Sequence, residues 1–404
     1  MRSEDTGHST RSCLTSRGFI LALLIGILAL GIGRTPIDVS GQTLLSRIGD
    51  YYGELSSDSI SRGEVDVDID ELRGRLPALF REHETSHFII LSDADASVVR
   101  HLAGTLEKTH SQFVRACRRM GLKTTPLSRK YACTLFAKRE DFQAYALKYD
   151  QVSANWVGGY YANAGNYEVF YAAAQDPGSA QAQLQFQKWE DELDDTHVLI
   201  GEAKKRGDRS REKQLSQYAT QLSDHIKSER ERLRDFSTGQ SEGRTIHETV
   251  HLLAFNMGVQ SRYRNAPFWL SEGLATNFET TSSSSAFGPD FDDPIRRSGF
   301  REYLKRNHLL SVRSLVQITD VTGADRDEAD VLYQESYAFF HWLFRFHRKE
   351  LAALFRRYSQ NADEPGALPA GDLSGQDHVR EFEAIFGKCE SIQKSWLRWE
   401  RSQK

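Results

Sequence analysis

Two short stretches of the 404-residue chain combine the residue types from which metal sites are built. The first, IHETVH, places His247 and His251 four residues apart, with Glu248 directly after the first histidine. On an α-helix this spacing turns the two side chains about 40° apart around the axis, so both imidazoles can reach one metal ion. Glu248 lies beside that face, where a carboxylate can act as general base towards a metal-activated water. The pattern therefore predicts a hydrolytic zinc site.

A catalytic zinc ion needs a third protein ligand and one open coordination position. The second stretch, PFWLSEGLATNFE, supplies Glu272 on a predicted helix that begins near Pro267. Gly273 would allow the two motif helices to approach closely at the ligand. The first motif alone arises by chance on solvated helix surfaces, but its combination with the second is much rarer. We therefore expect one Zn²⁺ per chain, held by His247, His251 and Glu272.

Glu279 lies on the same predicted helix face as Glu272. A carboxylate in this position can orient a ligand histidine by accepting a hydrogen bond from its second ring nitrogen. Most carboxylates on helices are solvent-exposed, however. We therefore interpret Glu279 as a surface residue, and the orienting role is the alternative.

The composition and the N-terminus place limits on partners and compartment. With 52 Lys and Arg against 56 Asp and Glu, the chain has neither the basic character of a nucleic-acid-binding protein nor a multi-span membrane profile. Residues 18–33 form a long apolar run after Arg11 and Arg17, which is typical of a secretory signal, with an uncleaved anchor as the alternative. We expect an exported protein, periplasmic or extracellular, or anchored facing outside the cytoplasm. Any membrane contact would come only from this anchor.

Three cysteines follow the predicted leader, and they lack the spacing of a metal site: Cys117, Cys133 and Cys389. Export would permit one disulfide, for which Cys117 with Cys133 is the simpler pairing. Three buried free thiols are the alternative.

Apolar periodicity divides the N-terminal half into three parts after the leader at residues 1–33. Residues 34–84 are polar and end in a short helix. Residues 85–179 alternate predicted strands and helices: a strand at 87–95, a helix at 96–117, a strand and helix at 131–149, and an aromatic hairpin at 156–173. This alternation predicts a mixed sheet with helices in the N-terminal part.

The C-terminal half is predicted to be helical. Residues 180–236 are rich in charge with a sparse apolar stripe, which predicts an inserted, coiled-coil-like hairpin of two helices. This hairpin is either a solvated spacer or a surface for a protein partner. Residues 237–404 are predicted as helices with short loops, among them a motif helix from Arg244 and helices at 331–358 and 377–400. The sequence thus predicts an α+β fold with a sheet-containing N-terminal part packed on a mainly helical C-terminal part.

These motifs resemble those of the gluzincin zinc metallopeptidases, which carry HExxH on one helix and a glutamate on a following helix. The similarity extends over residues 85–400 to an uncharacterised, exported, bacterial branch of that group, of the domain-of-unknown-function type, through blocks such as HFIILSDAD, GGYYANAGNYEVFY, YQESYAFFHWLF and FEAIFGKCESIQKSWLRW. The resemblance implies a zincin-like fold, hydrolysis of peptide bonds and a peptide or protein substrate. The insert at 180–236 departs from the compact form of the family.

The resemblance implies two further assignments. In gluzincins a tyrosine or histidine on a later helix donates to the oxyanion, and Tyr333 is similar to that residue, with Tyr337 and His341 as alternatives. The family also places an edge strand beside the zinc, where extended substrate pairs with the backbone. The residues that match this strand are Gly158, Gly159, Tyr160 and Tyr161, with Gly158 to Tyr160 as the substrate-binding candidates, and an ordinary hairpin is the alternative.

Two other functions are compatible with the same residues. A catalytically silent zincin-fold protein would serve as a binding or scaffold protein through the charged hairpin. A zinc hydrolase acting on a non-peptide amide, such as a cell-wall component, would use the same ligands and base. The presence of Glu248 together with all three ligands favours an enzyme.

Overall fold

The computed structural model describes residues 66–126, 128–152, 158–172, 177–321, 326–360, 368 and 372–403. The predicted leader and the segment 34–65 lie outside the described residues. The fold is α+β, as predicted, and the chain divides into two compact units, of which one contains residues 182–232 and the other the remaining described residues. Within these residues, no helix has both the length and the apolar character needed to cross a bilayer.

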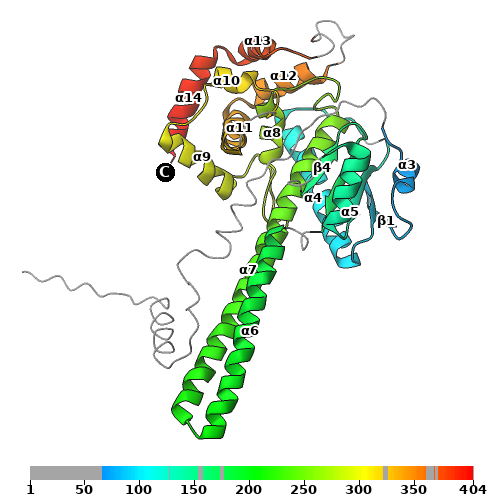
Figure 1. Cartoon of the computed structure of the whole chain (residues 1–404). Coiled ribbons are helices and arrows are strands. Elements are labelled where there is room, and N and C mark those ends of the chain that lie inside the picture. Colours follow the sequence, from blue (N-terminus) through cyan, green and yellow to red (C-terminus); the bar gives the residue numbers. More distant parts are fainter. Residues whose placement is uncertain are drawn as a thin grey trace, which may run out of the picture. The chain divides into compact units, whose positions relative to one another are not determined.

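A five-stranded mixed sheet forms the N-terminal part of the larger unit (Figure 1). Its strands lie in the order β1 (Arg81–Glu84), β2 (Phe88–Ser92), β3 (Tyr131–Phe136), β5 (Tyr167–Tyr171), β4 (Gly159–Ala162). The three central strands are parallel, and β1 and β4 are antiparallel edge strands. The predicted strand at 87–95 and the aromatic hairpin are confirmed. Strand β1 was not predicted, because its charged sequence REHE is mostly exposed at the sheet edge and lacks apolar alternation.

Successive side chains of a strand point to opposite faces of the sheet, and helices cover both faces. On one face Ile90 and Cys133 pack with α4 (Ala96–Met120) and with Ile246 of α7. On the other face Leu91 and Val169 pack against α3 (Ile69–Gly74) and α5 (Arg139–Tyr145), which is followed by the π-turn η1 (Ala146–Asp150). The described cysteines are three buried free thiols, so the Cys117–Cys133 disulfide is not formed.

Two long helices, α6 (Pro177–Arg206) and α7 (Arg209–Asn256), meet at Gly207, whose φ of 71° permits the left-handed stop. The prediction of a separate motif helix from Arg244 is wrong, because α7 continues without a break for 48 residues. No proline interrupts it. Gly239, which weakens the helix locally, faces Thr281 so closely that a β-carbon would lie 2.9 Å from the threonine β-carbon. Close packing explains that glycine.

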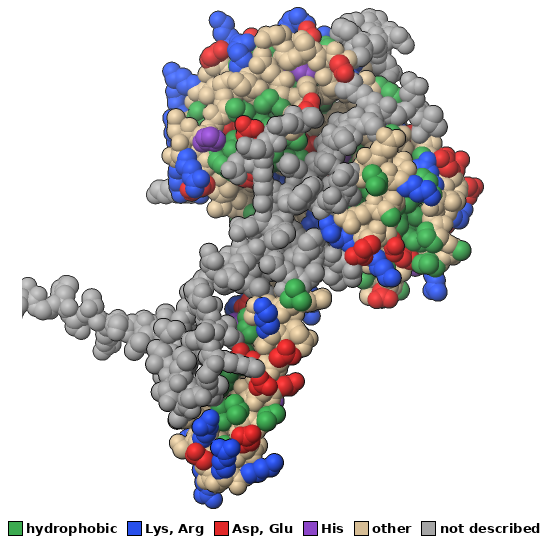
Figure 2. All heavy atoms as spheres, viewed as in Figure 1, with side chains coloured by type: hydrophobic (Ala, Val, Ile, Leu, Met, Phe, Trp, Pro, Cys, Tyr) green, Lys and Arg blue, Asp and Glu red, His purple; other side chains and the backbone are tan. Residues whose placement is uncertain are grey.

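The smaller unit is the predicted helical hairpin. Its inner face buries Phe186 and Trp189 of α6 and Leu222 and Ile226 of α7. The Trp189 ring lies 4.8 Å from that of His225, which joins the two helices. Side chains of both charges are scattered over the visible part of the hairpin (Figure 2), as expected for a solvated two-helix hairpin.

The C-terminal helices of the larger unit follow with short connections: α8 (Phe268–Thr276), α9 (Pro294–Arg306), α10 (Val312–Gln317), α11 (Arg326–Phe346), α12 (Arg348–Ser359), α13 (Gly375–Phe386) and α14 (Cys389–Ser402). The single helices predicted at 331–358 and 377–400 are each two helices. The breaks fall at His347, which leaves helical geometry, and at Gly387, whose φ is 85°. Helix α11 packs against both α8 and α9 and is central to this part of the core.

Candidate metal centre

The two histidines of the first motif project from successive turns of α7. The neighbouring face of the helix is anchored in the core by Ile246, Val250 and Leu253, none of which is exposed. The adjacent face presents His247 and His251, each 4% exposed. A buried apolar stripe beside a pair of imidazoles fixes the direction in which both rings point. The histidine pair is therefore positioned by the local sequence of α7.

Glu272 comes from α8, which begins just after Pro267 and is tied down where the Phe268 amide donates to the Ile318 carbonyl at 2.8 Å. The sequence prediction that Gly273 lets the two motif helices approach is wrong. Gly273 faces α11, where a β-carbon would lie 2.8 Å from the Ser336 carbonyl oxygen. This close approach to α11 holds α8 in place, so that Glu272 reaches the histidines with only 1% exposure.

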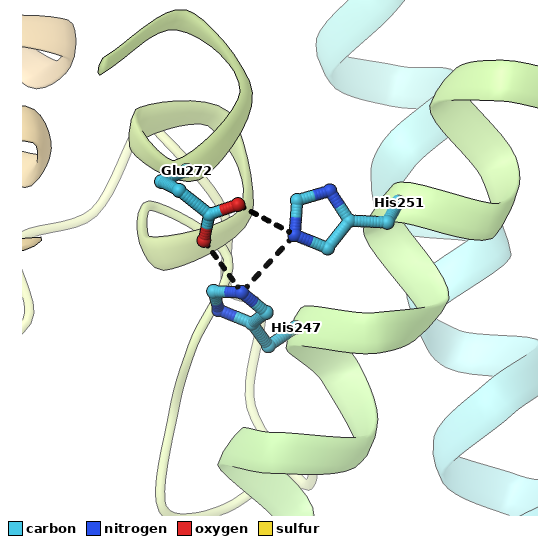
Figure 3. Close-up of side chains that lie close together, drawn as sticks. All are labelled: His247, His251 and Glu272. Carbon is cyan, nitrogen blue, oxygen red and sulfur yellow. Dashed lines mark hydrogen bonds and ion pairs between the residues drawn. The ribbon is translucent and has the colours of Figure 1, made fainter. Parts of the chain in front are cut away.

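The three predicted ligands converge on one point (Figure 3). His247 Nε2 lies 3.0 Å from Glu272 Oε2, His251 Nε2 lies 3.2 Å from Glu272 Oε1, and the two Nε2 atoms are 3.1 Å apart. Tetrahedral zinc with bonds of about 2.0–2.1 Å separates its ligand atoms by about 3.3 Å. The two nitrogens are therefore almost as far from each other, and each from its nearer carboxylate oxygen, as two ligands of one tetrahedral ion, and one ligand atom from each residue lies within 4.8 Å of the other two.

The chemistry of this donor set also fits a cation. Burial lowers the pKa of His247, but hydrogen bonds to Glu272 and Glu279 raise it further, so its pKa lies well above the usual value. Glu272 Oε1 is buried, and its contact with His251 Nε2 at 3.2 Å lacks the geometry of a hydrogen bond. A divalent ion would satisfy these acceptors, and His247, His251 and Glu272 would hold it.

Glu279 is not the surface carboxylate that we predicted. Its Oε1 lies 2.7 Å from His247 Nδ1, and only 17% of its side chain is exposed. Because the carboxylate can only accept, Nδ1 donates, and Nε2 is directed at the metal position. Arg296 of α9 holds the same carboxylate through two hydrogen bonds. The hydrogen bond that the alternative role of Glu279 requires is therefore present.

The second ligand histidine has a weaker support. His251 Nδ1 lies 3.5 Å from Ser271 Oγ, which in turn donates to Gln260 Oε1 at 3.3 Å. The two ligand histidines are therefore held differently, one by a charged carboxylate and the other by a neutral hydroxyl. Sequence reasoning gave no signal for Ser271 or Gln260, because neither spacing nor residue type marks them as metal-site residues.

Glu248 is fixed by the edge of the sheet. The backbone amide of Tyr161 in β4 donates to Glu248 Oε2 at 3.0 Å. Glu248 Oε1 is buried, and no residue in the described parts of the chain donates to it. Burial raises the pKa of Glu248, against the opposing effects of His247 and His251. One carboxylate oxygen is thus held in place, and the other can receive a proton.

The predicted substrate strand lies next to Glu248, and its last residue, Tyr161, makes the contact. Gly159 and Tyr160 belong to β4, and Gly158 directly precedes it. The Tyr160 side chain points to the far face of the sheet, where its hydroxyl donates to Asp150 at 2.6 Å. Tyr161 instead faces α7 and stacks on Phe255 with ring centroids 5.7 Å apart. Alternation along the strand therefore places Tyr160 and Tyr161 on opposite faces of the sheet.

Among the three predicted oxyanion donors, Tyr333 lies against the ligands. Its ring centroid is 6.4 Å from that of His247. The other two hold the start of α9: Tyr337 Oη accepts from the Asp293 amide at 2.8 Å, and His341 Nε2 lies 3.3 Å from Asp292. The structure thus brings Tyr333 to the cluster and gives Tyr337 and His341 packing and hydrogen-bonding roles.

Residues 243–363, which include both motifs and Tyr333, match a family described as a protein of unknown function (DUF1570). No curated protein matches the chain. The matched segment contains the three ligand side chains, Glu248 and Glu279, so the candidate metal centre falls inside it. The sheet that positions Glu248 lies outside the matched residues.

Proposed function

We propose that this chain is an exported, zinc-dependent metallopeptidase of the gluzincin type. The observation that carries the proposal is the buried convergence of His247, His251 and Glu272, with Glu248 fixed beside them by the Tyr161 amide. Zinc in such a site polarises a carbonyl and lowers the pKa of a bound water. Export rests on the apolar leader at residues 18–33.

In this proposal the protein residues divide the work. Glu248 takes the proton of the attacking water on Oε1 and passes it to the leaving amine, because Oε2 is engaged by Tyr161. Tyr333, whose ring lies beside His247, donates to the developing oxyanion. The outer edge of β4, with which no described strand pairs, binds extended substrate, since strand alternation turns the backbone groups of Gly159 away from β5.

The test is cleavage of a defined mixture of extended peptides, with new termini identified by mass spectrometry. The purified full chain loaded with zinc is expected to cleave peptides, to lose this activity with a zinc chelator and to regain it with added zinc. Absence of cleavage by the zinc-loaded chain would contradict the proposal. Cleavage of amides in cell-wall fragments, with peptides left intact, would support the non-peptide hydrolase instead.

A second prediction concerns the Tyr161 amide. Its N–H points away from β5, so Tyr161→Pro removes the hydrogen bond to Glu248 without removing a bond of the sheet. A hydrogen bond to a charged group contributes about 1.5–3 kcal/mol, so kcat is expected to fall roughly tenfold to hundredfold while zinc stays bound.

The control is Tyr161→Ala, which keeps the amide and removes the same ring that stacks on Phe255. Both variants lack the ring and only the proline variant lacks the N–H, so the difference between their kcat values measures the contribution of the N–H group. Equal kcat values in the proline and alanine variants would show that the amide does not position Glu248.

A further inference from the structure

Arg296 occupies a position that the energetics of its own helix do not explain. It lies in the first turn of α9, where Asp293 caps the helix by accepting from the amides of Ile295 and Arg296 at 2.8 Å each. A positive side chain at a helix N-terminus is unfavourable, because the helix dipole places partial positive charge there. Its side chain is only 21% exposed. A partner outside the helix must therefore hold the guanidinium.

That partner is Glu279. Arg296 Nε donates to Glu279 Oε2 at 2.7 Å, and Nη2 donates to Oε1 at 2.9 Å. This two-point contact fixes both the position and the plane of the carboxylate, which a single ammonium group cannot do. The oxygen that faces Nη2 is also the one that accepts from His247 Nδ1. One guanidinium therefore determines how the carboxylate meets the ligand.

The same guanidinium also reaches the residue proposed to bind the oxyanion. Its central carbon lies 5.9 Å from the centre of the Tyr333 ring, within the range of a cation–π contact. Helix α9 is itself held by Tyr337, which accepts from Asp293, and by Arg297, which donates to Glu400 at 2.9 Å. The start of α9 is thus fixed independently of the metal ligands.

We propose that Arg296 is a positioning residue of the metal centre, which sets zinc affinity by locking Glu279 against His247 and which orients Tyr333 from the same side. This inference rests on the zinc site of the proposed function and assigns a role to α9, which carries none of the predicted site residues. Because Arg296 touches no ligand directly, its effect on the metal passes entirely through Glu279.

The experiment measures zinc affinity of the full chain by competition with a chromophoric chelator, together with the visible absorption of the cobalt-substituted protein. Arg296→Met is expected to lower zinc affinity about 10- to 100-fold, the usual effect of losing a partner behind a metal ligand. Arg296→Lys, which restores the charge without the two-point geometry, should recover part of the loss. Glu279→Gln should weaken binding similarly, and the double variant should be no weaker than the weaker single variant.

A matched control is Arg357→Met. Arg357 Nε donates to Glu381 at 2.8 Å in an ion pair of similar exposure, and neither residue contacts a ligand. Its zinc affinity and cobalt spectrum should be those of the wild type. If thermal unfolding shows that Arg296→Met is poorly folded, the zinc affinities of Arg296→Lys and Glu279→Gln still test whether Arg296 acts through Glu279.

Unchanged affinity and spectrum in both Arg296 variants, with the wild type binding zinc, would overturn the role of Arg296 and leave the proposed peptidase intact. Additive losses in the Arg296 and Glu279 double variant would overturn the claim that Arg296 acts through Glu279. A wild-type chain that binds no zinc would overturn this inference and the proposed function together. A wild-type chain that binds zinc but cleaves no peptide would contradict the proposed function and leave the role of Arg296 intact.

Discussion

Glu248→Gln is expected to retain zinc and to lower turnover by about two to four orders of magnitude, the usual contribution of a general base. The structure explains why this substitution should remove the base without moving the side chain. The Gln carbonyl can accept the Tyr161 amide in place of Glu248 Oε2, so the side chain keeps its position. The amide nitrogen then stands where Oε1 was, and it cannot take a proton from water. The expected loss is therefore in kcat, with little change in zinc affinity.

The measurement is steady-state cleavage of a peptide found in the library screen, with zinc content determined on the same preparation. Glu242→Gln is the matched control, because Glu242 is a buried carboxylate of the same helix that accepts from the Ser283 amide at 2.7 Å, away from the ligands. It should keep wild-type turnover. Full activity in Glu248→Gln would require another base and would remove the central step of the proposed reaction.

The residues that the sequence predicts well are those whose relation is local. His247, Glu248 and His251 lie within two turns of one helix, so helical periodicity alone fixes their relative directions. The strands at 87–95 and 156–173 carry apolar or aromatic runs that bury both faces of the sheet. The sequence also predicts Glu272 as the third ligand, because its motif begins a second helix a short distance after the first.

The residues that the sequence does not predict depend on packing between distant elements. The sequence predicts Glu279 at the surface because its helix position does not reveal Arg296, which approaches from α9. The contact of Tyr161 with Glu248 joins residues 87 positions apart. Helix α7 continues through Gly239, a weak helix former that packs closely against Thr281. Local propensity is too small to settle such cases against tertiary packing.

Removal of both histidine ligands is expected to abolish stoichiometric zinc binding. Wild-type chain purified with zinc should carry about one ion, since three protein ligands with one open position define a catalytic zinc site. In His247→Ala/His251→Ala, Glu272 and Glu279 would face the emptied position without the rings that they contact. A lone carboxylate ligand does not retain zinc against a chelator. Metal content by plasma mass spectrometry measures the outcome.

Two further variants separate loss of ligands from loss of fold. His341→Ala removes an equally buried histidine that contacts Asn277 and Asp292, so it should keep its zinc. Glu272→Gln changes the third ligand with almost no change in shape, and it should lose zinc while unfolding at a temperature close to that of the metal-free wild type. Zinc retained at one ion per chain in the double histidine variant would place the metal elsewhere. Since no other group of His, Cys, Asp and Glu in the described residues converges in this way, that result would also remove the structural basis for Glu248 as the base.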